Sequence, residues 1–156
     1  MADQLQKSER HILGTAKRWE PADADYHNPS SGFPTIAVGH HLYGDADGAR
    51  EAFAAQNAEM ALRINEEIYI LNDPTRRPVA DATSAMSLGD QTRTMTGKAI
   101  LDDGSQVALT SVRWRRGAIE LCVDVVAPAG TDSSALVQQA VQALDAAYTA
   151  KPIAGF

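Results

Sequence analysis

The chain has 156 residues, with 14 Lys or Arg and 20 Asp or Glu, and its net charge is −6. This length predicts one domain, residues 1–156, and the acidic balance argues against general nucleic-acid binding, which needs a basic surface. No apolar run approaches the roughly 20 residues that cross a bilayer. Hydrophobic residues make up 44% of the chain but aromatic residues only 6%, so we expect a core of aliphatic side chains packed against a sheet.

The N-terminus and the cysteine content bear on location. Residues 1–10 are polar and mixed in charge, unlike the apolar segment of a signal peptide. We therefore expect a cytoplasmic protein, or an extracellular or envelope-anchored one if a signal was removed. Cys122 is the single cysteine, which excludes an intramolecular disulfide and a thiolate zinc site. Its position in an apolar run indicates an inert thiol on a strand.

The N-terminal part of the chain predicts a helix, a loop and a strand. Apolar residues recur at loosely helical spacing over residues 4–19, and Pro21 ends that helix. Residues 20–34 are rich in Pro, Asp, Asn, Ser and Gly and predict a loop. Residues 35–43 alternate between two faces, which is typical of a strand. One of these faces carries Ile36, Val38, His40 and Leu42.

A second helix and a long connection follow. Residues 44–48 predict a turn and a helix N-cap, and the helix extends to about Ile64. Residues 65–71 fit either a helix or a short strand, with the helix favoured. Residues 72–90 contain Pro74, Pro78 and Gly89 and predict a long connection, which in a small domain indicates a functional or disordered segment.

A three-strand meander is the best determined part of the sequence. Asp103-Gly104 and Arg116-Gly117 predict two-residue hairpin turns. Placed there, the turns pair Trp114 with Ile119, and Val112 with both Leu121 and Met95. The predicted apolar face comprises Met95, Ala99, Leu101, Val112, Trp114, Ile119, Leu121, Val123 and Val125. The predicted polar face comprises Thr94, Thr96, Lys98, Ser111, Arg113, Arg115 and Glu120, with Arg113 directly opposite Glu120.

The C-terminal segment predicts a capped amphipathic helix. Pro128 ends the last strand, and residues 131–134 provide the cap. Val137, Val141, Leu144 and Tyr148 form one stripe of the helix. The predicted order is α-β-α-β-β-β-α. We therefore predict an α+β fold in which an antiparallel sheet, one early strand plus the meander, packs against helices.

Two adjacent histidines are the first candidates for chemistry. His40 and His41 point to opposite faces of a strand, so they cannot chelate one metal. The simplest interpretation of His40 is a buried, hydrogen-bonded core residue, whereas a catalytic interpretation would use His40, His41 and Asp45. No motif has metal-ligand spacing, and no phosphate-binding, dinucleotide-binding or nucleophile motif occurs, so we predict no metal and no cofactor. Asp102-Asp103-Gly104 predicts a hairpin turn, since the glutamate that a calcium loop requires is absent.

A basic cluster near Trp114 is the second candidate. It contains Arg113, Arg115 and Arg116, and the predicted register places Arg93 opposite Trp114, where a cation–π contact is expected. One interpretation is a solvated sheet face with one salt bridge. The other is a site for a small anionic ligand or a protein partner, to which Arg76 and Arg77 of the long connection contribute.

The chain resembles a broad group of bacterial proteins at Ser87-Leu88-Gly89-Asp90, at Val112 to Ile119 and in its closing helix. These are small secreted or lipid-anchored α+β domains, including sensor-like extracellular domains of actinobacterial kinases. The helix entry from Gly44 to Phe53 fits as well, and the resemblance covers roughly residues 36–150. It implies a non-enzymatic envelope role, with no catalytic residues to carry over. The chain departs from the group by lacking the signal and the lipobox cysteine. Its architecture is also similar to PsbP-like folds.

Three functional hypotheses follow. The leading one is a non-enzymatic binding or accessory module of the bacterial cell envelope that uses a sheet face or the 72–90 connection. The alternative is a small enzyme with a histidine acid–base site between sheet and helices, as in cone-shaped folds of ketosteroid-isomerase type. The third is a homodimer that buries an apolar patch on the polar sheet face, formed by Ile100, Val107 and Leu109.

Overall fold

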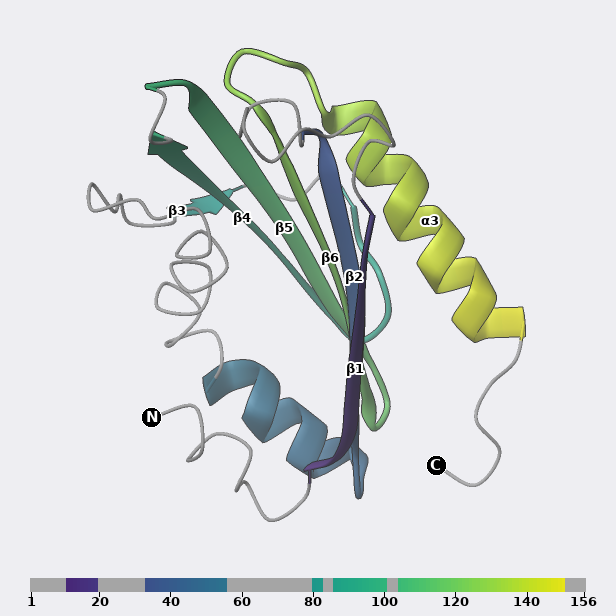
Figure 1. Cartoon of the computed structure of the whole chain (residues 1–156). Helices are drawn as coiled ribbons and strands as arrows, with labels where there is room; N and C mark the ends of the chain where they lie inside the picture. Colours follow the sequence, from purple (N-terminus) through teal and green to yellow (C-terminus); the bar gives the residue numbers. More distant parts are fainter. Residues whose placement is uncertain (1–10, 20–32, 56–79, 83–85, 101–103, 151–156) are drawn as a thin grey trace.

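The computed structural model describes residues 11–19, 33–55, 80–82, 86–100 and 104–150. Their strands form one antiparallel sheet of six, in the spatial order β1-β2-β6-β5-β4-β3 (Figure 1). The strands are β1 (His11–Trp19), β2 (Thr35–Tyr43), β3 (Ala80–Ala82), β4 (Gln91–Ile100), β5 (Gln106–Arg116) and β6 (Ile119–Pro128), and the last helix is α3 (Ser134–Ala150). Residues 46–55 are also helical. The predicted α+β class is confirmed.

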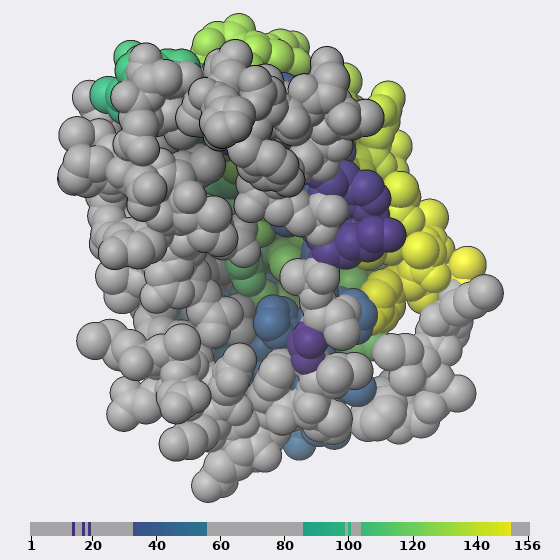
Figure 2. Space-filling model, in the orientation of Figure 1, coloured from purple at the N-terminus to yellow at the C-terminus, as the bar shows by residue number. Residues whose placement is uncertain are grey.

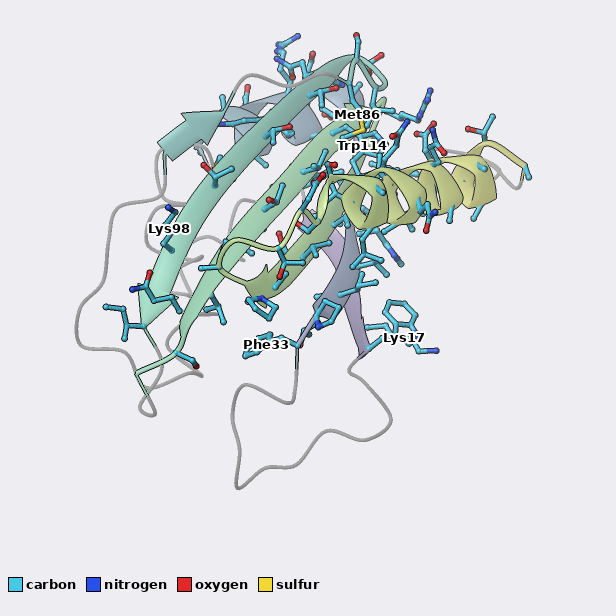
Figure 3. All side chains as sticks on the ribbon, turned by 90° about the horizontal axis from the view of Figure 1, so that it is seen from above. Lys17, Phe33, Met86, Lys98 and Trp114 are labelled. Atoms are coloured by element: carbon cyan, nitrogen blue, oxygen red, sulfur yellow. The ribbon has the colours of Figure 1, made fainter. Side chains whose placement is uncertain are left out.

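The two helices lie on opposite sides of the sheet, α3 along its length and the helix over 46–55 at one end (Figure 1). We call the side that α3 covers the α3 face. Its core consists of Leu42, Val112, Trp114, Ile119, Leu121, Val123 and Val125, packed against Val137 and Val141 of the helix. Met86 packs against the same core, beside Trp114 and α3 in Figure 3.

The other side, which we call the opposite face, carries the alternate residues of the same strands. From the strand register these are Ala37, Gly39 and His41 on β2, Glu120, Cys122 and Asp124 on β6, Ser111, Arg113 and Arg115 on β5, and Arg93 and Met95 on β4. Figure 2 shows green strand atoms, with the helix over 46–55 (blue) below them and β1 (purple) to their right.

Several elements form where their local patterns place them. β2 spans the predicted residues, Thr35–Tyr43. The Asp45 carboxylate accepts a hydrogen bond from the Gly48 backbone N–H at 2.7 Å and caps the helix over 46–55. The predicted extension of this helix to Ile64, and the helix-or-strand question at 65–71, lie outside the described residues. α3 begins after Asp132, whose carboxylate accepts a hydrogen bond from the Ser134 N–H at 3.0 Å.

The predicted N-terminal helix is wrong over residues 11–19. This segment is β1, which pairs antiparallel with β2, with Trp19 opposite Ile36 and Thr15 opposite His40. Residues 4–10 lie outside the described part. The loose apolar spacing of this segment fitted a helix. However, β6 pairs with only one edge of β2, and β1 satisfies the backbone N–H and C=O groups along the other edge of β2. The sheet therefore has one strand before β2 that the sequence did not predict.

The predicted long connection, residues 72–90, is also interrupted by a strand. β3 pairs with β4 through three residues, with Asp81 opposite Met95. Within the predicted connection, residues 80–82 therefore form a strand, whereas residues 86–90 have no regular secondary structure. Three residues are too few for an alternation pattern to appear in the sequence.

The register of β5 against β6 differs from the prediction by two residues. Trp114 pairs with Leu121 and Arg116 with Ile119, so the two-residue turn consists of Gly117 and Ala118. Gly117 has a φ of 56°, and glycine at the first turn position meets this requirement without the strain that Arg116 would incur. A shift of two residues preserves the side-chain alternation, so the predicted faces of β5 and β6 are correct.

The register of β4 against β5 differs from the prediction by one residue, which exchanges the faces of β4. Thr94 lies opposite Val112, and Met95 lies opposite Ser111. Five residues, 101–105, separate the paired Ile100 and Gln106, instead of a two-residue turn. Thr94, Thr96 and Lys98 thus belong to the α3 face and Met95 to the opposite face. Since β4 has few large apolar side chains, its alternation constrained the register only weakly.

Both faces of the central strands are buried, whereas the prediction had one polar, solvated face. β6 is buried at eight of its ten positions, and β5 at seven of its eleven. Val107 and Leu109, predicted as part of a dimer patch, are already buried within the single chain, while Ile100 is half-buried. In the described ranges no helix is long and apolar enough to cross a membrane.

Gly89 makes a close approach that predicts a specific loss of stability. Its φ is 54°, and a Cβ atom there would collide with the Arg115 carbonyl oxygen, which accepts the Asp90 N–H at 2.7 Å. Gly117 has a similar φ but open space around it. We expect Gly117→Ala to cost about 1 kcal/mol from backbone strain, and Gly89→Ala about 1–3 kcal/mol more from overpacking. Urea unfolding of both variants measures the difference, and equal losses would contradict the close contact.

Candidate functional site

A buried ion pair lies at the centre of the opposite face. The Arg113 Nη1 donates to Glu120 Oε1 at 3.1 Å, and the Tyr43 hydroxyl donates to Glu120 Oε2 at 3.4 Å. Glu120 is 0% exposed and Arg113 6% exposed. β5 and β6 bring the two residues together as diagonal neighbours, since Arg113 pairs with Cys122 and Arg115 with Glu120. The predicted contact between Arg113 and Glu120 is therefore present, but the two residues are diagonal instead of direct neighbours, and both are buried.

The surroundings of Arg113 stabilise the charged form of its guanidinium. Burial on its own lowers the pKa of the guanidinium, but the nearby Cys122, Asp124 and Glu120 and the hydrogen bond to Glu120 more than offset this effect and raise the pKa above its usual value. Arg113 therefore stays charged in the sheet, as a guanidinium does in nearly all proteins. The buried charge is tolerated because two carboxylates share its environment.

Two polar side chains beside this pair have unused hydrogen-bonding capacity. Ser111 and Asp124 lie directly opposite each other on β5 and β6 and are 0% and 6% exposed. Ser111 Oγ and Asp124 Oδ1 make no hydrogen bond within the part of the chain that the structure describes. A buried polar atom without a partner costs about 1–3 kcal/mol. Such atoms in a native fold point to an additional bound molecule or a function.

Sequence reasoning missed Ser111 and Asp124 as site residues. The signal that was present is a single carboxylate within the apolar run from Leu121 to Val126. A charge at an interior position of a central strand is rare unless it is paired or functional. The prediction treated this face as solvated, and on a solvated face an aspartate needs no explanation.

Arg115 lies on the same face, near the hairpin turn. Its Nε donates to Gln91 Oε1 at 3.1 Å, and its Nη1 donates to the Gly117 carbonyl oxygen at 2.8 Å. The same Nη1 forms an ion pair with Asp90 at 3.1 Å. Arg115 thus holds the turn against the start of β4.

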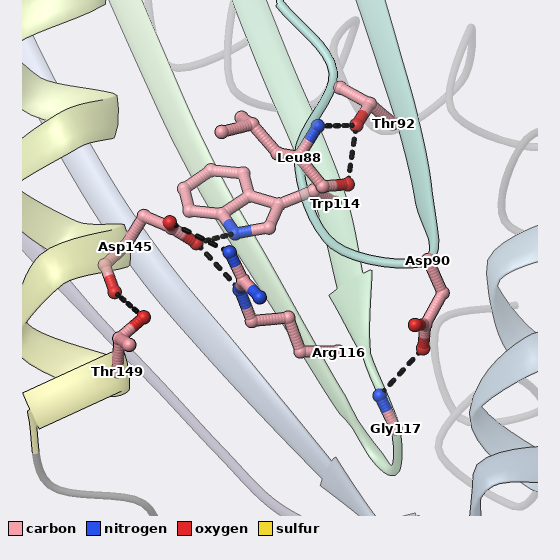
Figure 4. A network of polar contacts seen from close by, with 8 residues as sticks. All are labelled: Leu88, Asp90, Thr92, Trp114, Arg116, Gly117, Asp145 and Thr149. Atoms are coloured by element: carbon pink, nitrogen blue, oxygen red, sulfur yellow. Dashed lines mark hydrogen bonds and ion pairs between the residues drawn. The ribbon is translucent and has the colours of Figure 1, made fainter.

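Trp114 and Arg116 lie on the α3 face and bind the helix (Figure 4). The Asp145 carboxylate of α3 accepts hydrogen bonds from Trp114 Nε1 at 2.9 Å and from Arg116 Nε and Nη2 at 2.8 and 2.9 Å. The hydrogen bond from Arg116 is the main cause of the lowered pKa of Asp145. The same bond raises the pKa of Arg116. These contacts give Trp114 and Arg116 a clear role in docking α3.

The segment before β4 is tied to the same turn (Figure 4). The Thr92 hydroxyl accepts a hydrogen bond from the Leu88 N–H at 2.8 Å and donates one to the Leu88 carbonyl at 2.7 Å. The Asp90 carboxylate accepts the Gly117 N–H at 2.8 Å. The Leu88-Gly89-Asp90 turn that suggested a family resemblance is therefore a structural element that locks the β5–β6 hairpin.

The predicted arginine site is divided between the two faces of the sheet. Arg113 and Arg115 lie on the opposite face, whereas Arg116 and Trp114 lie on the α3 face. The expected pairing of Arg93 with Trp114 is wrong, because Arg93 lies opposite Arg113 and Thr92 lies opposite Trp114. Arg76 and Arg77 lie outside the described residues. Each of the three arginines on β5 has a carboxylate partner.

The histidines are also separated, as strand geometry requires. His40 lies on the α3 face, and its ring meets the Tyr148 ring of α3 edge-on, with centroids 5.7 Å apart. Burial lowers the pKa of His40 and raises that of Tyr148. His41 lies on the opposite face, across from Glu120. Asp45 is occupied as a helix cap, so the structure does not gather His40, His41 and Asp45 into one site.

Metal ligands do not converge in the described ranges. No group of three or more His, Cys, Asp or Glu side chains there has an arrangement that could hold a metal ion. Cys122 is buried on the opposite face.

No family model, curated protein or solved structure matches the chain. The resemblance to small bacterial envelope domains therefore remains a prediction.

The buried ion pair predicts unequal costs for two neutralising substitutions. Glu120→Gln preserves side-chain shape but leaves the Arg113 charge buried beside fewer negative groups, so we expect a loss of about 3–5 kcal/mol. Asp145→Asn is the matched control at a more exposed pair, where we expect about 1 kcal/mol. Urea unfolding at pH 7 measures both. A loss for Glu120→Gln no larger than that for Asp145→Asn would contradict the importance of the pair.

The burial of His40 predicts that stability changes near neutral pH. Because the pKa of His40 is lowered in the folded state, the unfolded chain binds the proton more tightly. Stability should be complete above the unfolded pKa of about 6.5 and fall as the pH decreases through this value towards the folded pKa. His40→Phe retains an aromatic contact with Tyr148 and cannot titrate. Urea unfolding at pH 7.5 and 5.5 should show a smaller pH effect in this variant than in the wild type, and an equal effect would refute the assignment.

Proposed function

We propose that the protein is a non-enzymatic binding module and that it binds a small molecule on the opposite face of the sheet. The observation that carries this proposal is the presence of two adjacent buried polar atoms, Ser111 Oγ and Asp124 Oδ1, without hydrogen-bond partners in the described ranges. A bound molecule would satisfy both atoms and offset their desolvation cost. A place in the bacterial cell envelope, which the family resemblance implies, belongs to the same proposal.

The surroundings of these atoms favour a preformed binding site. Arg113 and Glu120 are held by the ion pair and by Tyr43, so the polar groups sit on rigid strands. β2 contributes only small side chains here, with Ala37 opposite Asp124 and Gly39 opposite Cys122. Rigid elements and short neighbours are features of ligand sites, which are usually largely preformed.

The enzyme alternative has less support. His41 lies opposite Glu120 on the same face, and a histidine beside a carboxylate can act as an acid–base pair. However, the two oxygens of Glu120 accept hydrogen bonds from Arg113 and Tyr43. These bonds favour a structural role for Glu120, so we place binding before catalysis.

Methionine NMR tests binding with an internal control. The chain has four methionines, of which Met95 is opposite Ser111 and Met86 packs against the core on the α3 face. In protein labelled with 13C at the methionine methyl groups, a ligand on the opposite face should shift the Met95 signal and leave the Met86 signal in place. A chemically diverse panel of small molecules provides the ligands, and Met95→Leu and Met86→Leu assign the signals.

Ala37→Leu is the matched blocking variant, because it adds bulk next to Asp124. We expect it to abolish the ligand-induced shift of Met95 while the unliganded spectrum stays dispersed. If no compound in the panel shifts the Met95 signal at millimolar concentration, binding on this face is contradicted.

A further inference from the structure

The chemistry of the opposite face restricts what it can bind, and this restriction rests on the proposed function. The relevant groups are the partnerless atoms of Ser111 and Asp124 and the charges around them. Thr94 Oγ1 is another buried atom without a hydrogen-bond partner in the described ranges, but it lies on the α3 face opposite Val112. It is therefore separated from the other two by the sheet itself.

The first restriction comes from hydrogen bonding. A carboxylate such as that of Asp124 only accepts hydrogen bonds, whereas the Ser111 hydroxyl can both donate and accept. Directly opposite residues in an antiparallel pair have Cβ atoms about 5 Å apart. A ligand group that binds both residues must therefore present a donor to Asp124. An acceptor next to it pairs with the hydroxyl hydrogen of Ser111, which a second ligand donor would leave unpaired.

The second restriction comes from charge. The buried charged residues of this face are Arg113, Arg115, Glu120 and Asp124, and their formal charges cancel. Two further charges near this face lie closer to water and also cancel: Arg93, opposite Arg113, is half-buried, and Asp90, the ion-pair partner of Arg115, is exposed. An ionic ligand group would add an unbalanced charge to a desolvated, already neutral set, which is costly.

We propose that Ser111 and Asp124 bind an uncharged ligand group that offers a hydrogen-bond donor and an acceptor side by side, such as a carboxamide or two neighbouring hydroxyls. Asp124 Oδ1 accepts from the ligand N–H or O–H, and the Ser111 hydroxyl donates to the ligand oxygen. Tyr43, Arg113 and Glu120 hold the strands that carry both residues and are positioning residues in this site.

Four small probes of similar size test the ligand class by the same Met95 methyl signal. Acetamide and ethylene glycol carry the two uncharged chemistries, while acetate and methylammonium are the anionic and cationic counterparts. We expect a saturable Met95 shift with acetamide, ethylene glycol or both, and the stronger of the two identifies the group. Tighter binding of acetate or methylammonium would overturn the inference but leave the proposed function standing.

Substitutions test the two residues. Asp124→Asn should weaken binding of the active probe about 10-fold, because the amide oxygen still accepts a hydrogen bond but the charge that strengthens this bond is removed. Ser111→Ala should weaken it about 5-fold. Thr94→Ala removes an equally buried, partnerless hydroxyl from the other face and should leave binding unchanged. Equal effects of Ser111→Ala and Thr94→Ala would overturn the assignment.

The stability of the unliganded protein separates a binding role from a structural one. Because the Ser111 hydroxyl has no partner in the described ranges, its removal should leave urea unfolding unchanged or shift the midpoint upward. A clear loss of stability in Ser111→Ala would show that the hydroxyl supports the fold and would contradict the proposal. If none of the four probes shifts the Met95 signal, the inference about the ligand group is overturned. The proposed function is then still decided by the diverse panel of small molecules.

Discussion

The buried ion pair between Arg113 and Glu120 limits how β5 and β6 can be arranged. Both side chains are almost completely removed from solvent, so each needs the other and the surrounding hydrogen bonds. A slip of one residue in either strand would turn one member of the pair towards Val137 and Val141, in the core under α3. The apolar alternation of these strands and the ion pair thus impose the same two faces.

The ion pair alone does not choose between registers that differ by two residues. The predicted register makes Arg113 and Glu120 direct neighbours, and the observed one makes them diagonal neighbours, and both bring opposite charges together. The turn decides, because Gly117 supplies the positive φ at its first position. Asp90, just before β4, then holds this turn, and Gly89 permits the close approach.

The docking of α3 combines apolar burial with one polar anchor. Val137 and Val141 pack on the sheet, while the Asp145 carboxylate accepts hydrogen bonds from Trp114 and Arg116. Apolar packing is non-directional, so the fixed geometry of these hydrogen bonds specifies where the helix lies along β5. With α3 covering one side, the polar residues of the opposite face become the candidates for binding, and the sheet keeps the two sets apart.

The sequence by itself determined the elements whose signals are local. Strict alternation determined β2, the turn chemistry determined the existence of the β5–β6 hairpin, and the Asp45 and Asp132 caps with an amphipathic stripe determined where helices begin. The α+β class and the separation of His40 from His41 followed from these elements.

Tertiary structure decided whatever depends on contacts between distant segments. β1 is a strand because it pairs with the edge of β2 that β6 leaves open. The faces of β4 follow from its register against β5, in which five residues separate the paired Ile100 and Gln106, and its own alternation is too weak to set this register. It also decided that the polar face is buried, which turned a predicted surface of arginines into an internal ion pair beside Ser111 and Asp124. The physical reason is that alternation reports which side chains share a face, whereas burial and pairing depend on what else packs there.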